Sequence, residues 1–128
     1  ADTYGAGTLG SAMTESSGVF TFPSTGYWFL DYNITFYDSA VQDHMMPIIN
    51  TTTDNSTYTR AADSSCHITD AGTTVYATAG CNFLFDVTST SLCKVMFSFK
   101  FVGKTTGYIG TNPGHNVTYF TFTRLADT

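Results

Sequence analysis

The side chains best suited to covalent chemistry or metal binding are three cysteines and three histidines. Cys66, Cys81 and Cys93 lie 15 and 12 residues apart, whereas zinc sites usually contain a closer pair of ligands. A catalytic thiol needs a base within hydrogen-bond reach and a third group that orients the base. Cys66 and His67 are adjacent, so on a strand they would point to opposite faces. We therefore expect no metal site and no Cys/His catalytic site.

The redox state of the thiols is left open by their number. Three cysteines cannot form a closed set of disulfides within one chain. One disulfide with a free thiol and three reduced thiols both fit the sequence. Because disulfides seldom form in a reducing cytoplasm, assembly there would leave all three reduced.

The carboxylates gather in the middle of the chain. Paired carboxylates can act as acid and base in glycoside hydrolysis, and clustered ones can bind calcium. The Asp-x-Asp-x-Asp-Gly spacing of a calcium loop does not occur, and no pair is fixed by spacing. We interpret these side chains as solvated loop carboxylates, and we expect no enzymatic activity and no cofactor. The set comprises Asp38, Asp43, Asp54, Asp63 and Asp70.

Four Asn-x-Ser/Thr sequons occur although the chain has only six asparagines. They begin at Asn33, Asn50, Asn55 and Asn116. This excess over chance favours a glycosylated secreted protein. Thr and Asn are also natural in strands and turns, so the sequons have a second explanation.

The composition indicates one all-β domain. Of 128 residues 16% are aromatic and 12% are charged, and the net charge is −5. Disordered chains are richer in charge, helical proteins are richer in Ala, Leu, Glu and Lys, and nucleic-acid binding needs a basic surface. The longest apolar stretches are too short to cross a bilayer, so we expect no membrane insertion. The start at Ala1 shows no signal-peptide pattern, as in a processed or excised piece of a longer protein.

Alternation of apolar and polar residues predicts the strands. The clearest are 27–36 and 94–102, and 19–22 and 117–125 follow the same pattern. Weaker strands are expected at 45–49, 58–61, 73–78 and 81–87, with Pro47 favouring an edge position. The inward positions predict a core of Trp28, Leu30, Ile34, Val95, Phe97, Phe99, Phe120 and Phe122.

The number of aromatic residues exceeds what one core needs. The chain has 20 aromatic residues and four methionines, whereas two sheets absorb about 10–12 large inward side chains. We therefore expect one flank to be buried against copies of the same chain.

Irregular regions are expected at 38–70 and 104–115, and loops at the ends of a sandwich carry variable contacts. Their polar and aromatic residues suit a sugar chain or a capsid neighbour. The candidate contact residues are Asp54, Asn55, Tyr108, Asn112 and His115.

Two stretches resemble a known superfamily. Residues 18–30 resemble the Gly-x-Phe-Thr-x-Pro-x-x-Gly-x-Tyr-x-Phe stretch of the complement globular-head branch of the tumour-necrosis-factor-like superfamily, with Trp28 and Leu30 at its Tyr and Phe positions. Residues 118–125 resemble its last strand, with Thr121 where that strand has Gly. Residues 85–91, 94–97 and 122–128 most resemble virion proteins of tailed bacteriophages that carry this domain.

The resemblance implies a two-sheet antiparallel jelly-roll sandwich assembled as a three-fold trimer, with Tyr119 near the axis and Phe120 facing the sandwich core. It implies a non-enzymatic structural or adhesive virion protein of a bacteriophage, on a head fibre, a tail fibre or the capsid as a decoration. Residues 18–128 would form the domain. An arm at 1–17 would contact a capsid or fibre neighbour, and host-surface polysaccharide is a further possible partner. The alternatives are a secreted, glycosylated complement-head-like recognition domain and a carbohydrate-binding module.

Overall fold

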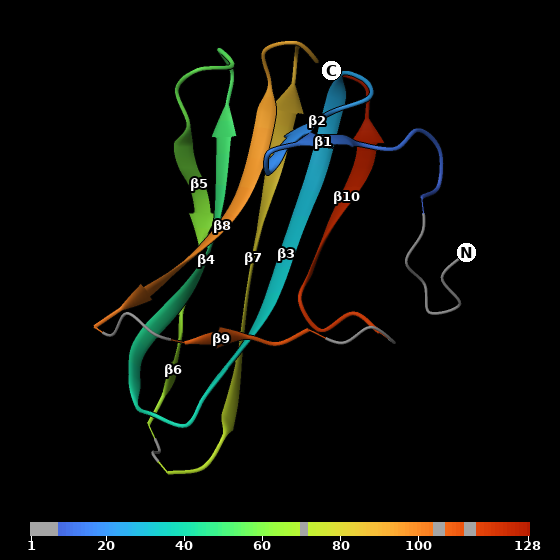
Figure 1. The fold of residues 1–128 in the computed structure, drawn as a ribbon. Coiled ribbons are helices and arrows are strands. Elements are labelled where there is room, and N and C mark those ends of the chain that lie inside the picture. Colours follow the sequence, from blue (N-terminus) through green and yellow to red (C-terminus); the bar gives the residue numbers. More distant parts are fainter. Residues whose placement is uncertain (1–7, 70–71, 104–106, 112–114) are drawn as a thin grey trace.

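The computed structural model describes residues 8–69, 72–103, 107–111 and 115–128, and within these ranges every regular element is a strand (Figure 1). The strands are β1 (Thr14–Ser16), β2 (Val19–Thr21), β3 (Gly26–Asp38), β4 (Gln42–Thr52), β5 (Thr59–Asp63), β6 (Cys66–Ile68), β7 (Val75–Val87), β8 (Lys94–Val102), β9 (Tyr108–Ile109) and β10 (Tyr119–Ala126).

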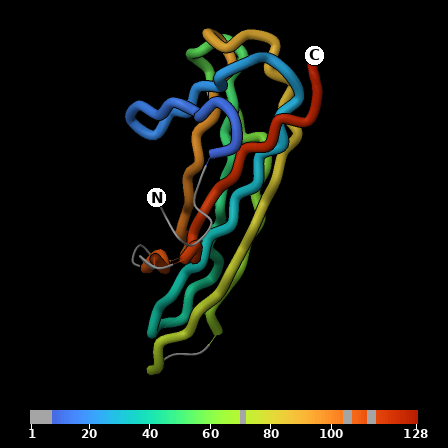
Figure 2. The backbone as a smooth tube through the Cα atoms, turned by 90° about the vertical axis from the view of Figure 1, so that its right-hand side faces the viewer, coloured from blue at the N-terminus to red at the C-terminus, as the bar shows by residue number. Residues whose placement is uncertain are grey.

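The strands form two antiparallel sheets that pack as layers (Figures 1 and 2). The six-stranded sheet has the order β1-β2-β8-β4-β5, and β6 also pairs with β4. The four-stranded sheet has the order β10-β3-β7, and β9 also pairs with β3. The chain changes sheet after β2, β3, β6, β7 and β8, so the predicted all-β class with two antiparallel sheets is confirmed.

The core lies between the sheets and is built on β3. The alternation predicted for this strand is confirmed, because inward residues are buried while their neighbours are partly exposed. From the opposite sheet, the inward side chains of β4 and β8 complete the core. The buried apolar residues include Phe22, Trp28, Leu30, Tyr32, Ile34, Phe36, Met45, Ile49, Ile68, Phe85, Val87, Cys93 and Val95.

The middle of the chain is more regular than the sequence indicates. Residues 38–70 were expected to be largely irregular, yet they hold β4, β5 and β6. The two strands expected at 73–78 and 81–87 are one strand, β7, which pairs with β3 from Val75 to Val87 without interruption. Gly80 lies inside this strand, where an added Cβ would approach the Asn33 side chain and the Tyr32 carbonyl at 3.2–3.3 Å.

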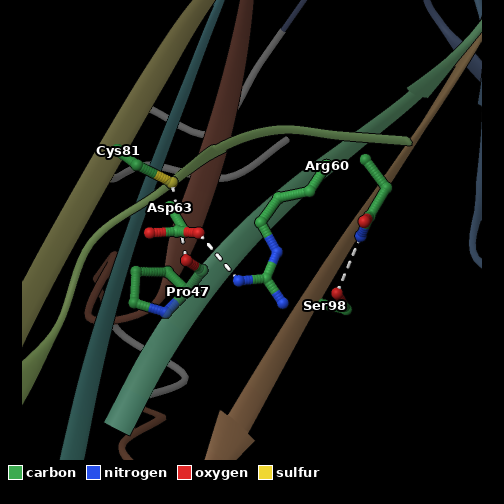
Figure 3. A network of polar contacts seen from close by, with 6 residues as sticks. Pro47, Arg60, Asp63, Cys81 and Ser98 are labelled. Carbon is green, nitrogen blue, oxygen red and sulfur yellow. Dashed lines mark hydrogen bonds and ion pairs between the residues drawn. The ribbon is translucent and has the colours of Figure 1, made fainter. Parts of the chain in front are cut away.

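Pro47 lies in a central strand, so the expected edge position is wrong. In an antiparallel ladder the N–H and C=O of one residue point to the same side. The Pro47 carbonyl accepts a hydrogen bond from the Cys81 thiol at 3.8 Å (Figure 3). It also accepts one from the Ser64 N–H at 3.4 Å, so the missing N–H of Pro47 faces β5 and β6. Those strands are interrupted at residues 64–65, which is why a proline fits there.

The β1–β2 hairpin lies partly in the segment that we expected to be an arm. Thr14–Ser16 pairs with Val19–Thr21 through a two-residue turn. Ser17 and Gly18 both have positive φ (53° and 79°), as the tight turns that match the twist of a hairpin require. Residues 14–16 therefore belong to the six-stranded sheet, and residues 1–7 lie outside the described ranges.

The predicted core is correct in part. Trp28, Leu30, Ile34 and Val95 are buried, and Phe97 and Phe122 are partly buried against the core cluster. Two assignments are wrong, because Phe99 is 46% exposed and Phe120 is 38% exposed. Both side chains point between the sheets, as predicted, but the sandwich is open where they lie.

Candidate functional site: an aromatic seam and a tyrosine row

A cluster of phenylalanines lines the open edge of the sandwich. This aromatic seam consists of Phe20, Phe97, Phe99, Phe120 and Phe122. The rings of Phe97 and Phe120 stack across the two sheets with centroids 4.4 Å apart and planes within 5° of each other. Phe20 contacts three other seam rings edge-on or tilted, at 5.0–5.8 Å.

The seam is open because the strands on either side of it are short. β2 pairs with β8 only at residues 94–96, so from Phe97 onward β8 has β4 as its single partner among the described residues. On the other sheet, β10 covers β3 only from residue 27 to residue 33. Phe99 therefore contacts the rings of Phe36 and Phe101 but remains 46% exposed.

A groove continues from the seam along β10. It has a volume of about 810 Å³ and lies between residues 8–13 on one side and residues 120–124 on the other, with Trp28 at its base. Residues 8–13 and two residues of the seam, Phe120 and Phe122, thus line the same groove.

Tyr119 lies on the other face of β10. It pairs with Asn33 on the outer face of the four-stranded sheet, while Phe120 points to the seam. Tyr119 therefore points away from the core. Its expected place near a three-fold axis remains a prediction.

A second aromatic feature is a row of tyrosines on the outer face of the four-stranded sheet. This tyrosine row consists of Tyr108 on β9, Tyr37 on β3 and Tyr76 on β7, which are register partners. The Tyr37 and Tyr108 rings are stacked at 5.1 Å and 17°, and the Tyr37 and Tyr76 rings are tilted at 5.4 Å and 34°. The two outer rings are 57% (Tyr108) and 66% (Tyr76) exposed.

A hydrogen-bond network around Thr35 holds the tyrosine row in place. The Gly110 N–H donates to the Thr35 carbonyl (2.7 Å), which fixes β9 against β3. Between β9 and β10, the Thr118 hydroxyl accepts from the Thr35 N–H (3.2 Å) and donates to the Gly110 carbonyl (2.8 Å). The Thr35 and Thr78 hydroxyls are 3.1 Å apart and join β3 to β7.

Asp54 and Asn55, two predicted contact residues, form the turn between β4 and β5. The Asp54 carboxylate accepts hydrogen bonds from the Thr57 and Ser56 N–H groups and from the Thr52 hydroxyl, at 2.7–2.8 Å. These donors hold the pKa of Asp54 well below its ordinary value. The carboxylate is thus used by its own turn, and Asn55 adopts the positive φ (58°) that closes the turn.

The structure does not gather the predicted contact residues into one site. The β4–β5 turn lies at one end of the molecule, whereas Tyr108 lies in β9 toward the other end (Figure 1). His115 is exposed between β9 and β10, and Asn112 lies outside the described residues. Tyr37 and Tyr76 were missed by the sequence analysis. The alternation along the strand could have indicated Tyr37, because it places this side chain on the face opposite to that of Phe36.

The three cysteines are free thiols, and two of them have a raised pKa. Burial, with the nearby Asp63 carboxylate as a second cause, raises the pKa of Cys81 to about 11. Burial also raises the pKa of Cys66. Tyr32 on β3 is the register partner of Cys81 on β7, and burial raises the pKa of Tyr32 to about 12. A thiol with a raised pKa is a poor nucleophile, so Cys66 and Cys81 contribute to the packing of the core, where the Cys81 thiol also donates to the Pro47 carbonyl.

In the part of the chain that the structure describes, no group of three His, Cys, Asp or Glu side chains could hold a metal ion. Nor do the described residues include a helix long and apolar enough to cross a membrane. Comparison with protein-family models finds no match, and a search of curated proteins finds none either.

Proposed function

We propose that this protein is a non-enzymatic structural and adhesive protein of a bacteriophage virion, a trimeric jelly-roll knob or capsid-decorating domain. The exposed aromatic seam is the observation that carries the proposal. The resemblance of residues 85–91, 94–97 and 122–128 to virion proteins of tailed phages supplies the location.

The strand order supports a jelly roll. In such folds the chain alternates between two sheets, and each sheet pairs strands that are distant in the sequence. Here β3 lies between β7 and β10, and β8 lies between β2 and β4.

The aromatic seam supports self-association. Large exposed apolar patches are rare on monomeric proteins, and the centres of oligomer interfaces are rich in aromatic residues. Half-exposed Phe99 and Phe120 continue directly into the core through Phe36 and Phe97. If a second copy of the chain covered Phe99 and Phe120, the interface would extend the existing core. No separate binding pocket would be needed.

Trimerisation would serve adhesion by multivalency. Three weak surface contacts on one rigid assembly bind far more tightly than one contact, provided that the geometry allows all three to engage. A capsid or fibre neighbour would bind through the part of residues 1–17 that precedes β1, and other surfaces would remain for the host.

One observation favours the alternative, a secreted recognition domain with the same architecture. Asn55 and Asn116, which begin two of the four sequons, are both exposed. A glycan needs such a surface position. Expression in a secreting eukaryotic host would add glycan mass at these residues if the alternative holds.

The proposal is tested by light scattering of the soluble protein. We expect a mass three times 13.9 kDa at micromolar concentration. A clean monomer would reject the trimer. Labelling of the protein on native phage particles would then test the virion location separately.

A further inference from the structure

We propose that the tyrosine row binds a neutral polysaccharide, with sugar rings stacked on Tyr76 and Tyr108. The inference rests on the adhesive part of the proposed function and names its ligand class and its site. It does not depend on the trimer, because all three tyrosines come from one chain.

The outer rings of the row offer open aromatic faces. Tyr37 lies in the middle, so its ring is covered on both sides by its neighbours. β7 and β9 have no further strand beyond them in the described part of this sheet, and Tyr76 and Tyr108 remain 66% and 57% exposed. The apolar C–H face of a pyranose ring packs on such a surface while its hydroxyl groups stay hydrated.

The surroundings of the row fit a sugar better than a protein. Next to the row, the outward positions hold Asn33 and Thr35 on β3 and Thr78 and Gly80 on β7. None of these four residues is charged, and amide and hydroxyl groups are of the kind that bind a carbohydrate. The Thr35 hydroxyl already contacts the Thr78 hydroxyl and the Val117 carbonyl, so a sugar would add to an existing polar network. The opposite end of the same sheet face is more apolar, with Phe29 and Leu84 as register partners.

Charge favours a neutral ligand over an anionic one. The chain carries a net charge of −5. Among the described residues no basic side chain is a register partner of the row, and the net negative charge of the chain would repel an anionic polysaccharide.

The row is held in place before a ligand arrives. The Gly110–Thr35 and Thr118–Gly110 hydrogen bonds fix β9 on the edge of β3, and the ring stacking restricts the side chains. A preformed platform loses little conformational entropy on binding.

The test is saturation-transfer NMR of the whole protein with three neutral probes: maltohexaose, cellohexaose and a hexamer of N-acetylglucosamine. We expect at least one probe to bind with a millimolar or tighter Kd. Tyr76→Ala and Tyr108→Ala should each weaken binding about tenfold, the loss of one aromatic contact. Tyr76→Phe should retain most of the affinity, since the ring remains.

Tyr27→Ala is the matched control, because Tyr27 is 39% exposed on the same face of β3 at its other end. Equal weakening by Tyr27→Ala would overturn the site, and so would absence of binding for all three probes at about 10 mM. A change of oligomeric mass in Tyr76→Ala would overturn it as well, since the row would then lie between copies. Sugar binding by a protein of single-chain mass would reject the trimer and support the site.

Discussion

At the scale of single residues, Asp54 shows how a group that looks available for binding is used for structure. Its carboxylate accepts three short hydrogen bonds within one turn, so its charged form is favoured by folding. An acidic residue in a polar loop therefore gives little information about a ligand until its own hydrogen bonds are known.

Asp54→Ala should lower the melting temperature at pH 7, because the turn loses its acceptor. The pKa of Asp54 is lowered on folding, so its contribution to stability is complete above the unfolded value of about 3.9 and is lost as the pH falls below it. The difference between the variant and the native protein should therefore shrink on acidification. Asp86→Ala, at an exposed carboxylate on β7, is the control, and a difference that grows in acid would contradict the argument.

The thiols provide a second test at the residue scale. With a pKa near 11, Cys81 should react with iodoacetamide at pH 8 far more slowly in the folded protein than in the unfolded one. Mass spectrometry under non-reducing conditions should show three labelled cysteines after unfolding. A stoichiometric Cys81–Cys93 disulfide would contradict this expectation and would favour the secreted alternative.

At the scale of elements, the predictable strands are those that are exposed on one face only. β3 alternates because one side meets the core and the other is partly exposed, whereas β8 alternates in its sequence but its burial does not follow where Phe99 is exposed. β4 does not alternate, because Ile48 on its outer side is buried as well as Met45 and Ile49 on its inner side. Its sequence therefore gives no period from which a long central strand could be predicted.

The candidate sites were less predictable than the fold, for a related reason. Alternation predicts the direction in which Phe99 points, but whether that side is covered depends on how far β2 and β10 extend. The tyrosine row depends on pairing between residues 37, 76 and 108, which no local pattern encodes.

Thr118 lies between β9 and β10, and its hydroxyl links β3 to the residue that follows β9. Loss of this hydroxyl should therefore loosen β9. Thr118→Val keeps the shape but removes the partner of the Thr35 N–H and of the Gly110 carbonyl. We expect a cost of about 1–2 kcal/mol in unfolding free energy. Hydrogen exchange should become faster at the Thr35 and Gly110 amides. Thr123→Val, an exposed change on β10, should leave both rates unchanged.

At the scale of the whole molecule, the aromatic seam is the surface at which we propose that copies of the chain meet. Phe99→Glu places a charge where we propose that copies meet, and it should dissociate the trimer because a buried unpaired charge is costly. Light scattering measures the mass, and circular dichroism verifies that the sheets remain.

Leu92→Glu is the matched control for the seam. Leu92 is also 46% exposed, but it lies in the loop between β7 and β8. The trimer should survive this change. A trimer that also survives Phe99→Glu would move the proposed interface away from the seam.

The short reach of β2 along β8 also affects how the protein must be made. From Phe97 to Val102, β2 no longer pairs with β8, and this stretch of β8 is rich in alternating aromatic residues. Strand edges without a partner can pair with strands of other molecules. Lys100 is the only charged residue in that run, and single charges of this kind oppose fibril growth. A newly synthesised chain would therefore be at risk of amyloid-like aggregation along this edge, and the risk would rise with the concentration at which the protein is produced.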